Sequence, residues 1–278
     1  MARHRSLFSA LTRRGPHRVL RGDLGFAGIP GLVFTPASGF RLPGVAFGHD
    51  WLTAVDHYTG TCAHLASWGI VTAAPDTQRS PVPSVLTLGH DLSSTLEVIS
   101  EIRLGDGHIS VDEDALAVAG HGFGGAAAAF AAAGRSGLKA AAAVFPSVTT
   151  PSAETAAATL RMPGLVLATP DDTKSLRLDA LELSQNWKGS VLRVVNKARA
   201  AELAEKRRFA GLLGFPGSKN RTQRTVRALL TGFLLFHLTG EKKYQPFADA
   251  EAKFPRTGAM DPDAPPVSQE DRIIALFR

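Results

Sequence analysis

The residues best suited to chemistry lie in a glycine-rich turn near the middle of the chain. The sequence GHGFGG at 120–125 stands between an apolar run, Ala115 to Ala119, and the small-residue segment AAAAFAAA. A strand, a sharp turn flanked by glycines and a helix are the setting of a nucleophile elbow, whose pattern G-x-S-x-G exposes a serine. Here the central residue is Gly122. The turn therefore predicts the backbone of a nucleophile site without a nucleophile.

The other two members of a hydrolytic triad would be a carboxylate and a histidine, following the nucleophile in that order. Asp172, with Asp171 beside it, follows the apolar run 164–168 and is the acid candidate. The base should follow the last strand, but no histidine occurs between His121 and His237. His237 falls in a segment with helical periodicity, where packing is the expected role.

Other nucleophiles are weaker candidates. Cys62 lies on an apolar helical stripe and is expected in the core. Ser147, Thr149, Thr150 and Ser152 follow a strand and are expected to cap the next helix. An active site built from residues that do not align with the triad remains the second hypothesis.

Backbone donors can survive the loss of catalytic side chains. Loss of a triad serine or histidine costs on the order of a millionfold in turnover, so ester hydrolysis by this route is not expected. The N–H groups of Phe123 and Asp50 would still form an oxyanion hole, bordered by Trp51 and His121. In this loop we expect the backbone of His49 and Asp50 to matter more than their side chains. The sequence predicts a water, carbonyl or carboxylate bound at Gly122 and Phe123. We expect Gly122→Ser alone to be inactive and added Ala200→His to recover traces of activity.

The elements that would position these residues alternate in type. Short apolar runs alternate with segments of helical period, which predicts a parallel sheet with crossover helices. Expected strands are 18–24, 31–35, 44–47, 70–74, 115–119, 140–145, 164–168 and 191–195. The first two precede any helix and should form an antiparallel edge. Expected helices are 55–68, 90–103, 123–133, 174–187 and 221–238. The helix at 90 is expected to be capped by Asp91, Ser93 and Ser94, and the helix at 174 by Asp171, Asp172 and Thr173.

Four landmarks in series resemble the α/β-hydrolase superfamily, and within it the dienelactone-hydrolase-like and cutinase- or chlorophyllase-like esterases. They are LPGVAFGHDWLTAVDHYTGTCAHLASWGIVTAAPDT at 42–77, the turn at 120–125, PGLVLATPDDT at 163–173 and RALLTGFLLFHLTGEKKYQPF at 227–247. The resemblance implies an α/β-hydrolase fold with a mostly parallel, eight-stranded sheet, flanking helices and no large lid. It also implies a carboxylic-ester hydrolase, although the triad is incomplete. Alignment with these families places the missing histidine near Arg199 or Ala200. We expect a basic segment at 1–17, one α/β-hydrolase domain at 18–248 and a proline-rich, acidic, weakly structured tail at 249–278.

Charge and composition limit the partners. The chain has 278 residues, a net charge of +6 and one cysteine, which excludes a disulfide framework and cysteine-rich zinc sites. We expect neither a metal nor a cofactor. Basic residues cluster after the last strand, and the candidate patch comprises Arg199, Lys206, Arg207, Arg208, Lys219 and Arg221. This patch is either a solvated surface or a site for an anionic membrane, and no nucleic-acid motif accompanies it.

These observations favour a protein with a degenerate triad over an enzyme. Its expected role is binding, scaffolding or regulation, with a protein partner or a small acyl or carboxylate ligand. Peripheral binding to an anionic membrane is the third hypothesis.

The basic first residues lack the apolar core of a secretory signal, and the apolar window 115–134 is interrupted by His121 and glycines, so a cytoplasmic protein is expected.

Overall fold

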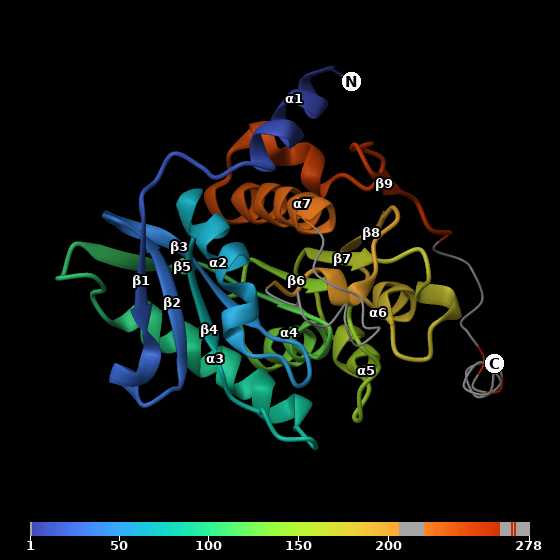
Figure 1. Ribbon diagram of the computed structural model, residues 1–278, viewed down its shortest axis with the longest axis horizontal. Helices are drawn as coiled ribbons and strands as arrows, with labels where there is room; N and C mark the ends of the chain where they lie inside the picture. The colour runs from blue at the N-terminus through green and yellow to red at the C-terminus, as the bar shows by residue number, and fades with distance from the viewer. Residues whose placement is uncertain (1, 206–219, 262–267, 269, 271–278) are drawn as a thin grey trace.

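A single mixed sheet organises the chain (Figure 1). The computed structural model describes residues 2–205, 220–261, 268 and 270. The strands are β1 (Val19–Asp23), β2 (Gly31–Pro36), β3 (Gly39–Gly48), β4 (Val71–Pro75), β5 (Ile109–His121), β6 (Ala140–Val144), β7 (Gly164–Ala168), β8 (Ser190–Val195) and β9 (Thr257–Gly258). Their order across the sheet is β1-β2-β4-β3-β5-β6-β7-β8-β9.

The direction of the strands agrees with the sequence pattern. The pairs from β4 through β3, β5, β6 and β7 to β8 are parallel, whereas β1 with β2 and β2 with β4 are antiparallel. The predicted α/β class and the antiparallel first two strands are thus confirmed. The prediction of eight strands is wrong by one, because β9 pairs antiparallel with β8. Two residues are too short to produce a period-2 signal, so this strand could not be seen in the sequence.

The helices are α1 (Ala2–Leu11), α2 (Thr59–Ser67), α3 (Val85–Glu101), α4 (Phe123–Gly134), α5 (Ala153–Ala157), α6 (Ala180–Asn186) and α7 (Asn220–Thr239), with 3-10 turns η1 (Leu24–Ala27), η2 (Val55–Tyr58), η3 (Asp172–Lys174), η4 (Ala200–Glu202) and η6 (Lys242–Ala248). The predicted start of α3 near residue 90 is wrong. The helix begins at Val85, because the Ser84 hydroxyl caps it by accepting the Thr87 N–H at 3.1 Å. The helix predicted over 174–187 is present only as α6, preceded by η3.

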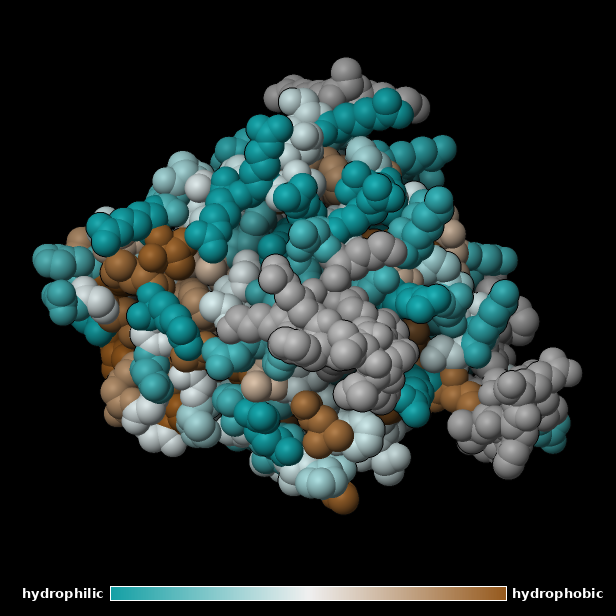
Figure 2. Space-filling view, in the orientation of Figure 1, coloured by the Kyte–Doolittle hydropathy of each residue, from teal (hydrophilic) through white to brown (hydrophobic). Residues whose placement is uncertain are grey.

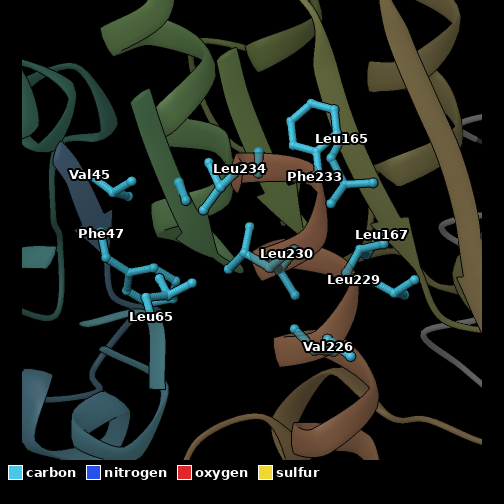
Figure 3. Close-up of a cluster of buried hydrophobic side chains, with 14 of the residues drawn as sticks. Val45, Phe47, Leu65, Leu165, Leu167, Val226, Leu229, Leu230, Phe233 and Leu234 are labelled. Carbon is cyan, nitrogen blue, oxygen red and sulfur yellow. The ribbon is translucent and has the colours of Figure 1, made fainter. Parts of the chain in front are cut away.

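Helices cover both faces of the sheet and create two cores. One core joins α1, α2 and α7 to the sheet, and the other joins α3, α4, α5 and α6 to the opposite face (Figure 1). Figure 3 shows the first core, in which Leu229, Leu230, Phe233 and Leu234 of α7 face Leu165 and Leu167 of β7. Burial of these side chains holds α7 on the central strands of the sheet.

α1 and the segment around Phe254 both pack on the first core. Phe8 of α1 and Phe247 of η6 stack on Phe254, with ring centroids 5.7 and 4.4 Å away. Arg193 of β8 is buried and donates to the backbone carbonyl of Ala252 at 2.7 Å. The beginning of the predicted tail therefore packs on the sheet, although most of the residues after 261 lie outside the described part of the chain.

The surface in the same orientation is largely hydrophilic, with hydrophobic residues gathered over β1 and β2 at the left of Figure 2. Among the described residues, no helix has the length and apolar character needed to cross a membrane.

Candidate functional site

The turn between β5 and α4 has the sharp backbone that the sequence predicts. Gly122 has φ 55° and ψ −118°, and its N–H donates to the Val144 carbonyl at 3.0 Å. Its own carbonyl accepts the N–H groups of Gly125 and Ser147 at 3.0 and 3.1 Å. Glycine adopts a positive φ without the steric cost that a Cβ imposes. Hydrogen bonds at both the N–H and the carbonyl of Gly122 therefore fix the conformation of the turn.

The neighbouring glycines allow α4 to approach the sheet closely. An ideal Cβ on Gly124 would lie 2.3 Å from the Gly48 carbonyl oxygen, at the end of β3. An ideal Cβ on Gly120 would lie 2.1 Å from the Gly124 carbonyl oxygen. The glycines at 120 and 124 are thus required by contact between backbones, which explains the spacing that the sequence shows.

The side chain of Asp50 occupies the space beside Gly122. Its Oδ1 accepts the Phe123 N–H at 3.0 Å and the Trp51 N–H at 2.8 Å. An ideal Cβ on Gly122 would lie only 2.1 Å from the same oxygen. The donor expected to bind a ligand therefore binds a carboxylate of the protein itself. The expectation that the backbone of Asp50 matters more than its side chain is wrong, because this carboxylate satisfies the first N–H of α4.

His121 belongs to a hydrogen-bonded chain behind the turn. The Asp50 N–H donates to the Tyr58 hydroxyl at 3.1 Å, and this hydroxyl lies 2.8 Å from Nδ1 of His121. Nε2 of His121 lies 3.0 Å from the Ala200 carbonyl oxygen. Because a carbonyl can only accept, Nε2 carries the hydrogen and Nδ1 accepts from Tyr58. Both ring nitrogens are thus used to connect Asp50 to the segment where the base would stand.

His49, the residue before Asp50, also uses its side chain structurally. Its Nδ1 lies 2.9 Å from the Asp50 carbonyl oxygen and its Nε2 lies 2.7 Å from the Thr77 carbonyl oxygen. The second contact joins the loop after β3 to the segment that follows β4. The expectation of a mainly backbone role is wrong for His49 too.

The acid candidate Asp172 is buried and serves as a helix cap. Its two carboxylate oxygens accept the N–H groups of Ala180 and Leu181, at 3.2 and 3.0 Å. These are among the first N–H groups of α6, which have no partner within the helix. None of the three positions predicted for the triad thus holds a residue in a catalytic arrangement. Position 122 is a glycine, and Asp172 caps α6. Ala200 accepts the Nε2–H of His121 through its backbone carbonyl.

The other candidate nucleophile and base residues have structural environments. Cys62 is fully buried in α2, and burial raises the pKa of its thiol far above the ordinary value. His237 packs edge-on against Phe233 and Phe236 in α7, and burial lowers its pKa. Ser152 caps α5 by accepting the Glu154 N–H at 3.2 Å, as the sequence predicts. None of these three side chains therefore gains a reactive environment.

The basic block after the last strand divides into exposed and buried members. Arg199 and Arg221 of the candidate patch are exposed. Arg227 is instead part of an internal ion pair, 2.7 Å from Glu205, whose carboxylate also accepts the N–H groups of Gly60 and Thr61 at the start of α2. Lys206, Arg207, Arg208 and Lys219 lie outside the described residues.

Several large apolar side chains are exposed in loops that follow β3, β4 and β6, beyond the ends of the strands that flank the turn. Trp51 and Leu52 are 49% and 54% exposed, and Val148 is 42% exposed. Val82, in the loop after β4, and Leu86, in the first turn of α3, are also exposed. The carboxyl ends of parallel strands share one edge of a sheet, which is where ligands of open α/β folds bind. These side chains therefore belong to the same edge as Gly122.

No protein-family model matches this chain, and no curated protein matches it either. The site is accordingly interpreted from its own residues. Sequence reasoning located the turn but missed the role of Asp50 and Tyr58. The sequence signal that could have revealed the role of Asp50 is the pairing of this aspartate, in the loop after β3, with a glycine at position 122.

Proposed function

We propose that this protein has an α/β-hydrolase fold without a working triad and acts as a binding, scaffolding or regulatory protein. The observation that carries the proposal is the placement of Asp50. Its carboxylate accepts the Phe123 N–H and occupies the space that the Cβ of a nucleophile at position 122 would need. A substrate oxygen would have to compete with a covalently tethered anion for that donor.

The arrangement of the sheet supports the proposed fold. The order β1-β2-β4-β3-β5-β6-β7-β8, with β2 antiparallel and the central strands parallel, is compatible with the proposed α/β-hydrolase sheet. The turn at Gly122 follows β5 and Asp172 follows β7, the strands after which such a fold carries its nucleophile and its acid. Both positions have acquired structural roles, which favours a non-catalytic protein over an enzyme with unaligned residues.

The exposed apolar residues at this edge support a binding role. Trp51 and Leu52 directly follow the residue that fills the site, and Val148 follows β6 on its other side. Aromatic and aliphatic side chains exposed together at one edge are a common feature of binding surfaces. In this proposal the edge of the sheet around Gly122 still binds a partner, although it no longer catalyses a reaction.

The absence of triad catalysis is tested by labelling and turnover. We expect no fluorophosphonate labelling and no hydrolysis of nitrophenyl butyrate above that of heat-denatured protein. Labelling abolished by one point mutation would establish an esterase instead. Salt-sensitive binding to anionic vesicles, lost when Arg207 and Arg208 are reversed in charge, would favour the membrane hypothesis.

A rescue experiment tests the role of Asp50 directly. In Asp50→Ala the Phe123 N–H becomes available, so millimolar formate or acetate should raise the melting temperature of this variant and leave that of the wild type unchanged. Asp56→Ala is a matched control, because Asp56 is a nearby surface carboxylate paired with Arg21. Equal responses of the two variants would show that the carboxylate at position 50 does not fill an anion site.

A further inference from the structure

Three carboxylates meet between α5 and α6, away from the turn at Gly122. They belong to Glu154 in the first turn of α5, Asp179 at the start of α6 and Glu182 in the first turn of α6. One oxygen from each residue lies within 4.8 Å of the other two. Residues separated by 25 positions in the sequence are thus brought to one point by the packing of two short helices.

Asp179 stands at the N-cap position of α6 but does not cap the helix. Its side chain makes no capping hydrogen bond, and the N–H groups of Ala180 and Leu181 donate to Asp172 instead. The backbone of Asp179 is anchored, because its N–H donates to the Pro146 carbonyl at 3.1 Å. The backbone of the residue is therefore held in place, while its carboxylate lies beside those of Glu154 and Glu182.

The Asp179 side chain is buried. Asp179 is only 3% exposed, and its Oδ1 has no hydrogen-bond partner among the described residues. A buried polar oxygen without a donor is costly and therefore uncommon in folded proteins. Burial, together with the nearby carboxyls of Glu154 and Glu182, raises the pKa of Asp179 well above its ordinary value. A cation bound between the three carboxyls would give the Asp179 Oδ1 a partner.

We propose that Glu154, Asp179 and Glu182 bind a calcium ion that joins α5 to α6. Oxygen-only donors suit hard divalent cations rather than zinc or copper. Calcium is bound at about 2.3–2.6 Å, so two of its ligands can lie up to roughly 5 Å apart, whereas magnesium at about 2.0–2.1 Å allows only about 4.2 Å. The three oxygens lie within 4.8 Å of one another, which is inside the range that calcium ligands can span.

The ion has a structural task in this position. Through Asp179 it would connect α6 to Pro146 after β6, and through Glu154 it would connect α6 to α5. Both helices cover the same face of the sheet, and Asp172 caps α6 from the loop after β7. Calcium would thus stabilise the segments that follow β6 and β7 without taking part in chemistry at Gly122. The expectation from the sequence that the protein binds no metal is revised by this proposal.

The test uses chelator-treated, full-length protein titrated with calcium chloride or magnesium chloride at constant ionic strength. Calorimetry and the melting temperature are the readouts. We expect saturable calcium binding with a rise in melting temperature, and at least tenfold weaker binding of magnesium. Asp179→Asn and Glu182→Gln should each weaken calcium binding at least tenfold. Without calcium, Asp179→Asn should melt no lower than the wild type, since it removes a buried carboxyl group that lies beside two others.

Two further variants make the result decisive. Glu97→Gln, which removes a carboxylate from an exposed ion pair with Arg135, should leave the calcium response unchanged. If Asp179→Asn does not fold, Glu182→Gln reports alone, because Glu182 is only partly buried. Absence of calcium binding at millimolar concentration, or an equal response in the wild type and both cluster variants, overturns the proposal.

Discussion

Gly122 and Asp50 depend on each other at the scale of single residues. A side chain at position 122 meets two obstacles: the positive φ of the turn, and an Asp50 oxygen 2.1 Å from the new Cβ. Gly122→Ala should therefore lower the free energy of unfolding by roughly 2–4 kcal/mol, from backbone strain plus the lost hydrogen bond to Phe123. Urea unfolding measures this loss.

The coupling of the two residues is tested by a double-mutant cycle. Asp50→Gly removes the clash, so Gly122→Ala should cost about 1–2 kcal/mol less in the Asp50→Gly background than in the wild type. Strictly additive free energies would show that Asp50 does not occupy the position inferred from the turn.

The same contact revises how catalysis could be restored. Gly122→Ser combined with Ala200→His was expected from the sequence to recover traces of activity. Since Asp50 blocks the Cβ at position 122 and uses the Phe123 N–H, we now expect this pair to be inactive. Adding Asp50→Gly should give the first detectable hydrolysis of nitrophenyl butyrate. Turnover by the pair without the third change would contradict the blocking role of Asp50.

At the scale of elements, Asp172 sets the start of α6. Its carboxylate accepts two N–H groups from the first turn, and removal of such a cap typically costs about 0.5–2 kcal/mol. Asp172 is also buried, so Asp172→Ala should destabilise the protein by roughly 2 kcal/mol in urea unfolding. Asp171→Ala is the control, because Asp171 is exposed and makes no capping hydrogen bond through its side chain. Equal losses in the two variants would argue against a specific cap.

The elements also show what the sequence can and cannot predict. The strands 164–168 and 191–195 stand out as apolar runs because both faces of the sheet are covered by helices. The sequence pattern does not predict α1. Its segment is rich in charged residues, and its two buried side chains, Phe8 and Leu11, are too few to give a clear helical period. The bond from Asp50 to Phe123 joins residues 73 positions apart, and no local pattern encodes the direction of a side chain across that distance.

At the scale of the whole molecule, α1, α7 and the segment around Phe254 cover the same face of the sheet. His64 of α2 is buried within this layer. Its Nε2 has no hydrogen-bond partner among the described residues. Burial, with a further contribution from the charge of Arg227, lowers the pKa of His64 to about 3. The packing of α2 against this face therefore requires a neutral imidazole.

This requirement predicts how stability depends on pH. The unfolded chain binds a proton at His64 near the ordinary pKa of about 6.5, whereas the folded protein does so only near 3. The contribution of His64 is therefore fully present above about pH 6.5 and declines as the pH falls toward 3. Between pH 7 and 5 the expected loss is roughly 2 kcal/mol. His64→Leu should flatten this part of the pH profile in urea unfolding, whereas His108→Leu, at an exposed position, should not. A wild-type profile that is flat from pH 7 to 5 would mean that the fold tolerates a charged His64, and that this layer is less tightly closed than its packing implies.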